Sequence, residues 1–156
     1  MMNILVIEDN EHKRNKVCNF IKSLSFDVNL NEAASFNSGV KAVAKYDLDL
    51  IILDMSLPTH DKSATESGGR FRVYGGKDII KKMIRKNIAT PFVILTQYSS
   101  FGEGESKKNI RDLSNELDSL FDNQHISTIH YETSSSLWKE KLQQVINDQY
   151  DKITNS

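Results

Sequence analysis

Three acidic side chains and one hydroxyl group each follow a short apolar run of the chain. These residues are Glu8, Asp9, Asp54 and Thr96. Carboxylates brought close together raise the pKa of at least one of them, so such a cluster usually holds a cation or a proton. An all-oxygen set with few protein ligands suits Mg²⁺, which keeps several waters and is often shared with a phosphate. A single acid after a strand could instead cap the next helix, but three acids at one edge indicate a site.

Five short apolar runs alternate with amphipathic segments and must position these side chains. The runs lie at residues 4–7, 28–30, 50–53, 92–95 and 126–130. Continuous apolar runs are typical of strands buried on both faces, and the segments between them have helical spacing. This pattern predicts an α/β fold: a single doubly wound (βα)5 domain with a central five-stranded parallel sheet. Ligands of such sheets bind beyond the carboxyl ends of the strands, where the acids stand.

The length and net charge of the chain limit the classes of protein to which it can belong. The chain has 156 residues, 20 Lys+Arg against 21 Asp+Glu and a formal net charge of -1. We expect one domain over residues 1–150, a frayed tail at 151–156 and no output domain. The single cysteine, Cys18, and the lack of a signal peptide or a long apolar run predict a soluble cytoplasmic protein. The near-neutral charge gives no reason to expect direct nucleic-acid or membrane binding.

Several relatives of this fold class do not fit the residues after the first run. A flavodoxin needs a phosphate loop rich in hydroxyls and amides, and a dinucleotide binder needs a G-x-G-x-x-G sequence there. This chain has Glu8 and Asp9 instead. A haloacid-dehalogenase-type phosphatase would need a second acid two residues after Asp54, and that place holds Ser56. Residues 60–74 form a polar connection much longer than the usual two to six residues or so, and we expect a loop there.

The ordered set of motifs resembles the receiver domain of two-component response regulators, the CheY-like family. The resemblance covers residues 1 to 98 and rests on residues 4–10 (ILVIEDN), 51–58 (IILDMSLP), 76–80 (GKDII) and 93–96 (VILT). It implies the flavodoxin-like strand order 2-1-3-4-5. It also implies a stand-alone receiver that accepts a phosphoryl group from a histidine kinase or phosphotransfer protein and signals through a partner protein.

The resemblance assigns a role to each residue at the carboxyl edge. Asp54 would be the phospho-acceptor, and Thr96 would hydrogen-bond a phosphoryl oxygen. Glu8, Asp9, Asp54 and the backbone carbonyl of Ser56 would hold Mg²⁺. A carboxylate-held Mg²⁺ neutralises charge on the transferring group, which is the main requirement of phosphoryl transfer. Such a protein catalyses its own phosphorylation and dephosphorylation and is not a turnover enzyme.

The chain departs from the family pattern at the end of the last strand. The family has a lysine there that pairs with the phosphoryl group, whereas we place Tyr131 at that position. Residues 126–138 contain no Lys or Arg. We therefore expect either weaker coupling between phosphorylation and conformation, or a replacement cation from the long loop at residues 60–74. The candidates are Lys62, Arg70 and Arg72.

Two further positions also depart from the family pattern. Gln97 replaces a very small residue and could crowd the pocket or orient a water, and the family's aromatic switch position falls near Thr128.

Two other functions therefore stay open. The chain could be a pseudo-receiver, a protein interaction module that signals through residues 60–74 without phosphate. The second alternative is an autonomous phosphatase for small phosphate esters.

Overall fold

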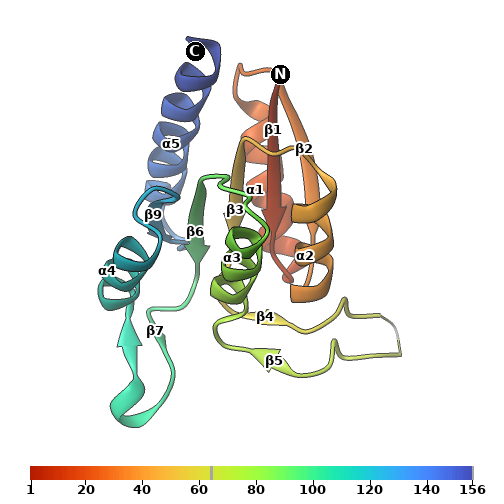
Figure 1. Cartoon of the computed structure of the whole chain (residues 1–156), viewed down its shortest axis with the longest axis vertical. Helices are drawn as coiled ribbons and strands as arrows, with labels where there is room; N and C mark the ends of the chain where they lie inside the picture. The colour runs from red at the N-terminus through yellow and green to blue at the C-terminus, as the bar shows by residue number, and fades with distance from the viewer. Residues whose placement is uncertain (64, 156) are drawn as a thin grey trace.

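Five parallel strands form the central sheet of the computed structural model, which describes residues 1–63 and 65–155. They are β1 (Met2–Ile7), β2 (Val28–Ala33), β3 (Leu50–Leu53), β6 (Phe92–Thr96) and β9 (His125–His130). Their spatial order is β2-β1-β3-β6-β9, so the expected order 2-1-3-4-5 is confirmed (Figure 1). All five strands are parallel, and their carboxyl ends therefore meet at one edge of the sheet.

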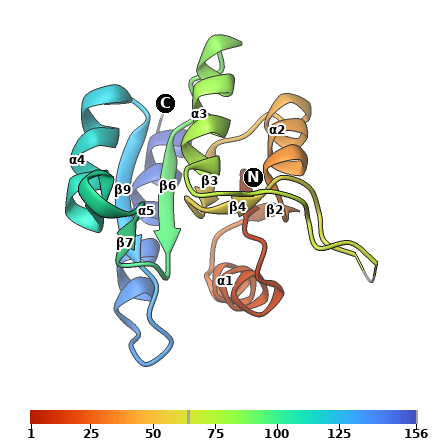
Figure 2. The same ribbon diagram turned by 90° about the horizontal axis from the view of Figure 1, so that it is seen from below.

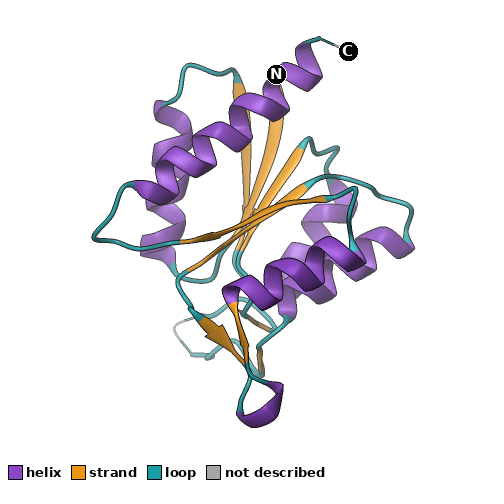
Figure 3. Ribbon diagram, turned by 90° about the vertical axis from the view of Figure 1, so that its left-hand side faces the viewer, coloured by secondary structure: helices purple, strands orange, loops and turns teal. Residues whose placement is uncertain are grey.

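In the described part of the chain, five α-helices cover the two faces of the sheet, as the views in Figures 2 and 3 show. Helices α1 (Glu11–Ser23) and α5 (Leu137–Thr154) lie on one face. Helices α2 (Phe36–Lys45), α3 (Gly75–Arg85) and α4 (Ile110–Leu120) lie on the other. None of the helices in the described part of the chain is both long enough and apolar enough to cross a bilayer.

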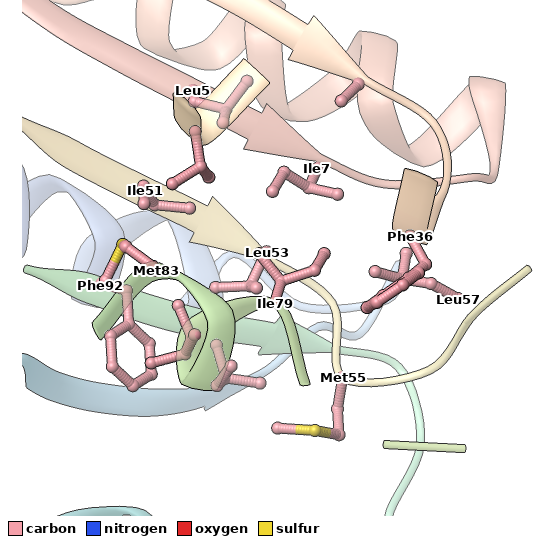
Figure 4. Packing of buried hydrophobic residues seen from close by; sticks show 14 of the residues in the cluster. Leu5, Ile7, Phe36, Ile51, Leu53, Met55, Leu57, Ile79, Met83 and Phe92 are labelled. Atoms are coloured by element: carbon pink, nitrogen blue, oxygen red, sulfur yellow. The ribbon is translucent and has the colours of Figure 1, made fainter. Parts of the chain in front are cut away.

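Alternate residues of β1, β3 and β6 supply the two apolar cores. Leu5, Ile7 and Leu53 belong to the core beneath α2, α3 and α4, and Figure 4 shows Leu53 beside Ile79 of α3. Val6 and Ile52 belong to the core beneath α1 and α5. Successive side chains of a strand point to opposite faces, so a strand covered on both sides must be apolar throughout. The continuous runs in the sequence follow from this arrangement.

The long connection after β3 contains a β-hairpin rather than only a loop. Strand β4 (Leu57–Pro58) pairs antiparallel with β5 (Phe71–Arg72). Within the predicted loop, residue 64 lies outside the described residues. The hairpin projects from the carboxyl edge of the sheet (Figure 1). Pro58 is buried while Phe71 is about half exposed, so one strand packs on the domain and the other faces outward.

A second hairpin lies between β6 and α4, at the same edge of the sheet (Figure 1). Strand β7 (Ser100–Phe101) pairs antiparallel with β8 (Lys108–Asn109), and the 3-10 helix η1 (Gly104–Ser106) lies between them. Phe101 is buried in the core on the α4 side. This insertion accounts for the length of the segment between the fourth and fifth strands of the sheet.

Helix α5 continues through Thr154, so most of the tail expected at residues 151–156 is helical. Tyr150 and Ile153 pack against the core beneath α1 and α5. The ring of Tyr150 also lies 4.8 Å from the ring of Phe26, measured between centroids. These apolar contacts hold the last turns of the helix in place. Residue 156, also in the predicted tail, lies outside the described residues.

Candidate functional site

The strand register brings three carboxylates together at the carboxyl edge. Ile7 is paired with Leu53, so Glu8 and Asp54 follow neighbouring strands at the same height. The backbone N–H of Asp54 donates a hydrogen bond to the carbonyl of Ile7, at 3.0 Å. One oxygen from each of Glu8, Asp9 and Asp54 lies within 4.8 Å of the others. The expected cluster of acids is therefore present.

Asp54 is held rigidly at the bottom of the site. Its side chain is buried, and its Oδ1 accepts a hydrogen bond from the backbone N–H of Met55 at 2.7 Å. The N–H of Gly76 donates to the carbonyl of Met55 at 2.8 Å, which ties the start of α3 to this segment. A Cβ at Gly76 would lie 2.4 Å from the carbonyl oxygen of Asp54. Only glycine allows α3 to approach the acceptor segment this closely.

Lys13 supplies a buried cation that sequence reasoning missed. Its Nζ lies 3.3 Å from Asp54 Oδ2 and also forms an ion pair with Glu8 Oε1. The same ammonium donates to the carbonyl oxygen of Leu95 at 2.8 Å and to Gln97 Oε1 at 3.0 Å. Only 4% of Lys13 is exposed. The side chain thus bridges the ends of β1, β3 and β6.

The position of Lys13 in α1 explains how it reaches the acids. Asn10 is the N-cap, and its side chain accepts from the N–H of Lys13, the third residue of the helix. A cation in the first turn opposes the helix dipole and needs an anionic partner there. Glu8 and Asp54 provide that partner. The available sequence signal was a lysine three residues beyond an N-cap that itself directly follows an acidic pair.

Glu8 is the most desolvated acid of the cluster. Burial raises its pKa well above the ordinary value, the neighbouring charge of Asp54 adds to this effect, and the Lys13 ammonium opposes it. Glu8 Oε2 accepts a hydrogen bond from the N–H of Asn10 at 3.0 Å. Among the described residues, no donor makes a hydrogen bond of acceptable geometry to Glu8 Oε1. That oxygen has only the ion-pair contact with Lys13.

Thr96 and Gln97 lie at the end of β6, as the sequence predicts. Thr96 is fully buried, and its Oγ1 accepts a hydrogen bond from the N–H of Tyr98 at 3.2 Å. Gln97 is exposed at the surface, but its carboxamide oxygen accepts from the Lys13 ammonium. Gln97 therefore accepts a hydrogen bond from Lys13 and helps to fix the position of the ammonium.

Tyr131 directly follows β9. Thr96 is paired with His130, and the N–H of Tyr131 donates to the carbonyl of Thr96 at 2.7 Å. The ring is buried, and its centroid lies 5.4 Å from Lys13 Nζ. Its hydroxyl finds no hydrogen-bond partner within residues 1–63 and 65–155. An aromatic ring thus stands at the strand end, with the cation on its face.

The cation beside Asp54 comes from α1 and not from the long connection, which one of the two expected alternatives named as its source. Lys62 Nζ lies 3.1 Å from Asp9 Oδ2 and reaches the rim of the cluster. The guanidinium of Arg72 instead lies over the ring of Phe36, at 4.0 Å from its centroid. Helix α1 is directly connected to the acidic pair, whereas the hairpin carries its basic side chains farther out. The short path from Asp9 to Lys13 decides which cation reaches Asp54.

The donor set fits a hard divalent cation. Three carboxylates converge, and one oxygen of the buried Glu8 lacks a hydrogen bond from the described residues. Ser56, whose backbone carbonyl is a candidate ligand, is buried. Its hydroxyl donates to the carbonyl of Val73 at 2.8 Å and so fixes the segment after Asp54. Oxygen donors of this kind suit Mg²⁺.

A groove lies beside Lys13 and Gln97. It has a volume of about 400 Å³ and lies between the start of α1 and the segment that follows β9. The side chains along it include Asn10, His12, Lys13, Gln97 and Tyr131. Lys13 therefore borders both the acidic cluster and this groove.

Comparison with known proteins gives one strong relative among the curated sequences. The chain is 32% identical over 143 residues to the Detocs response regulatory protein DtcB of Enterobacter cloacae, which covers 90% of this chain and 95% of DtcB. It is 24% identical to the uncharacterized protein y4jR of Sinorhizobium fredii, over 90% of this chain and 94% of that protein. A scan against protein-family models found no match.

Solved receiver structures share the fold. A response regulator receiver domain from Clostridium thermocellum has a TM-score of 0.63, 17% identity and coverage of 99% of this chain and 98% of that one. The response regulator protein TrrA from Thermotoga maritima, solved in complex with Mg²⁺-BeF, has a TM-score of 0.56 and 17% identity, over 92% of this chain and 98% of that one. With the sequence relationship to DtcB, these findings confirm the resemblance: the chain belongs to the CheY-like response regulator receiver family.

Proposed function

We propose that this protein is a Mg²⁺-dependent phospho-accepting receiver in which Asp54 takes a phosphoryl group from a histidine kinase or phosphotransfer protein. The observation that carries the proposal is the buried Asp54 carboxylate at the carboxyl edge, with oxygens of Glu8 and Asp9 within 4.8 Å. Membership of the response regulator family supports the same function. The complex of TrrA with Mg²⁺-BeF supports the choice of metal.

The transfer is an in-line displacement at phosphorus. An oxygen of the Asp54 carboxylate attacks the phosphorus, the new O–P bond forms, and the P–N bond to the donor imidazole breaks. The imidazole leaves with the electron pair of that bond and takes a proton from water. The Thr96 hydroxyl donates to a phosphoryl oxygen and orients the group. Mg²⁺ held by Glu8, Asp9, Asp54 and the Ser56 carbonyl would neutralise charge on the transferring group.

The phosphorylated form acts through a partner protein and not through turnover of a substrate. Phosphorylation adds negative charge and acceptor oxygens at one end of the sheet, which shifts the surrounding loops between two arrangements. We place this signalling in the cytoplasm, where histidine kinases expose their phosphodonor groups. The basic residues of α3 form a solvated helix face, and we assign no direct nucleic-acid contact to them.

Intact-protein mass spectrometry after incubation with acetyl phosphate and Mg²⁺ tests this function. Wild type is expected to gain one phosphoryl group, and Asp54→Asn is expected to gain none. Asp47→Asn is the matched control because it removes an exposed aspartate from the opposite edge of the sheet. A phosphoryl group on Asp54→Asn, or turnover of more than one equivalent of acetyl phosphate by Asp54→Asn, would contradict the proposal.

A specific observation favours one alternative, the pseudo-receiver. Lys13 forms ion pairs with both Asp54 and Glu8, and the hairpin of β4 and β5 exposes Phe71 and Val73. Such a protein would present its hairpin to a partner regardless of phosphate. Wild type that stays unlabelled with acetyl phosphate and with a phosphorylated histidine phosphotransfer protein, while still binding Mg²⁺, would favour this alternative.

A further inference from the structure

We propose that Lys13 of α1 is the phosphoryl-binding cation of this receiver, in place of a lysine at the end of the last strand. The inference rests on the proposed phosphorylation of Asp54. It assigns a catalytic role to a residue on a different element, the helix α1. The residue at the end of β9, Tyr131, then serves as the aromatic surface against which the ammonium rests.

The position of the ammonium carries the proposal. Lys13 Nζ lies 3.3 Å from Asp54 Oδ2, so a phosphoryl group bonded to this carboxylate would arrive beside a fixed positive charge. Within the described residues, Lys13 is the lysine or arginine that forms an ion pair with Asp54. The next cation of the site, Lys62, contacts Asp9 at the rim and has a side chain that is 55% exposed.

The anchoring of Lys13 keeps the ammonium in place during the reaction. Its contacts with the Leu95 carbonyl and Gln97 Oε1 lie on the side of β6, next to Thr96. These two acceptors are neutral, so they orient the ammonium without cancelling its charge. Both contacts thus hold the ammonium at the end of β6, the strand that also carries Thr96.

The number of contacts shows how the ammonium can change partners. A lysine ammonium has three N–H donors, whereas four oxygens surround Lys13 Nζ. The contact with Asp54 Oδ2, at 3.3 Å, is the longest of the four. A phosphoryl oxygen on Asp54 would be a better acceptor than this carboxylate oxygen because it carries more charge. The ammonium can therefore turn to it while keeping its contacts with β6.

Tyr131 explains why the cation comes from α1. Its ring fills the strand end, lies 5.4 Å from Lys13 Nζ and packs on Trp138 at 4.9 Å between centroids. A lysine at this position would bring a second ammonium toward the first. Two cations so close would repel each other, so an aromatic ring at this place is compatible with Lys13 where a lysine is not.

Beryllofluoride binding in the presence of Mg²⁺ tests the role of Lys13, because beryllofluoride mimics a phosphoryl group on a carboxylate. The Kd of Lys13→Met, measured by fluorine NMR, is expected to rise roughly 10- to 100-fold relative to wild type, as for the loss of a charged hydrogen bond. Labelling by acetyl phosphate should slow in parallel. Lys16→Met, on the exposed part of the same helix, is the matched control and should behave as wild type.

A double variant tests the position of the charge. In Lys13→Met/Tyr131→Lys, the cation returns at the end of β9, and beryllofluoride affinity should recover at least tenfold over Lys13→Met. A general loss of folding would not be repaired by a second substitution of this kind. Circular dichroism on each variant separates loss of the fold from loss of the ligand.

A measurement on the unmodified protein covers the case in which Lys13→Met does not fold. With nitrogen-15-labelled lysine, the Nζ resonance that is absent in Lys13→Arg identifies Lys13. Its shift on addition of beryllofluoride and Mg²⁺, beyond the shift with Mg²⁺ alone, is the expected result. An unchanged resonance would contradict the proposal.

The outcomes separate this inference from the proposed function. Wild type that binds beryllofluoride and takes a phosphoryl group, together with an equally competent Lys13→Met, would overturn the inference alone. Tighter binding by Lys13→Met would also overturn it, because the ammonium would then compete with Mg²⁺ for the acids. Wild type that neither binds beryllofluoride nor becomes labelled would overturn both.

Discussion

The ammonium of Lys13 lies over the ring of Tyr131, 5.4 Å from its centroid, although the two residues come from opposite ends of the chain. Lys13 belongs to α1, and Tyr131 follows β9, the last strand of the sheet. Attraction between a cation and a ring face is worth about 0.5–2 kcal/mol, depending on how far the cation is desolvated. This pair closes the site on the side where the family resemblance predicts a lysine.

Tyr131→Phe is expected to leave the free energy of unfolding unchanged or to raise it by about 1 kcal/mol. The Tyr131 hydroxyl is buried without a hydrogen-bond partner among the described residues, so its removal ends a desolvation cost. The ring contacts with Lys13 and Trp138 remain. Tyr131→Ala, which removes the ring as well, should cost about 3 kcal/mol. Urea denaturation measures both, and a loss above 1 kcal/mol in Tyr131→Phe would contradict the expectation.

Gly76→Ala is expected to destabilise the protein by about 1–3 kcal/mol and to displace Asp54. The new Cβ would lie 2.4 Å from the carbonyl oxygen of Asp54 and 3.1 Å from Met55 Cα, both of them backbone atoms that cannot rotate away. Lys81→Ala, on the exposed face of the same helix, is the control and should change little. Thermal unfolding and Mg²⁺ titration measure the two effects. A stable Gly76→Ala with normal Mg²⁺ affinity would be inconsistent with this contact.

Cys18 is expected to resist alkylation in the folded protein. Burial raises the pKa of its thiol to about 12, and the nearby charge of Glu32 adds to the effect. At pH 8 the reactive thiolate is therefore scarce as well as inaccessible. Iodoacetamide should modify Cys18 slowly in buffer and fully in denaturant, as followed by intact mass, with free glutathione as the reference thiol. Rapid modification in buffer would show that α1 opens readily.

Glu116→Gln is expected to lower stability at pH 7 by about 1 kcal/mol, as for partly exposed ion pairs. Hydrogen bonds from Lys108 and Lys77 hold the pKa of Glu116 below its ordinary value of 4.5. A lowered pKa stabilises the fold above the ordinary pKa, and the gain disappears as pH falls through the folded-state pKa. The difference between variant and wild type should therefore vanish in acid. Glu105→Gln, which changes an exposed acid of η1, is the control in thermal unfolding at pH 7 and pH 3.

The sequence by itself determined the sheet and the place of its acids. Strands covered on both faces must be apolar throughout, so the apolar runs at residues 50–53 and 92–95 predicted strands from the sequence alone. The carboxyl ends of parallel strands meet at one edge, so Glu8 and Asp54 were expected side by side, and their register confirms it. Their roles as metal ligand and phospho-acceptor stay predictions.

Only the tertiary structure decided which cation meets Asp54 and how the long connections fold. Lys13 bonds to the carbonyl of Leu95, 82 residues away, and no local pattern encodes a contact over that distance. Strands β4 and β5 have two residues each, too short for a periodic signal, and form because they pair with each other. A buried charged group is stable only where the folded chain surrounds it with ionic and hydrogen-bond partners. For Lys13 these partners lie at the ends of β1, β3 and β6, which only the tertiary structure brings together.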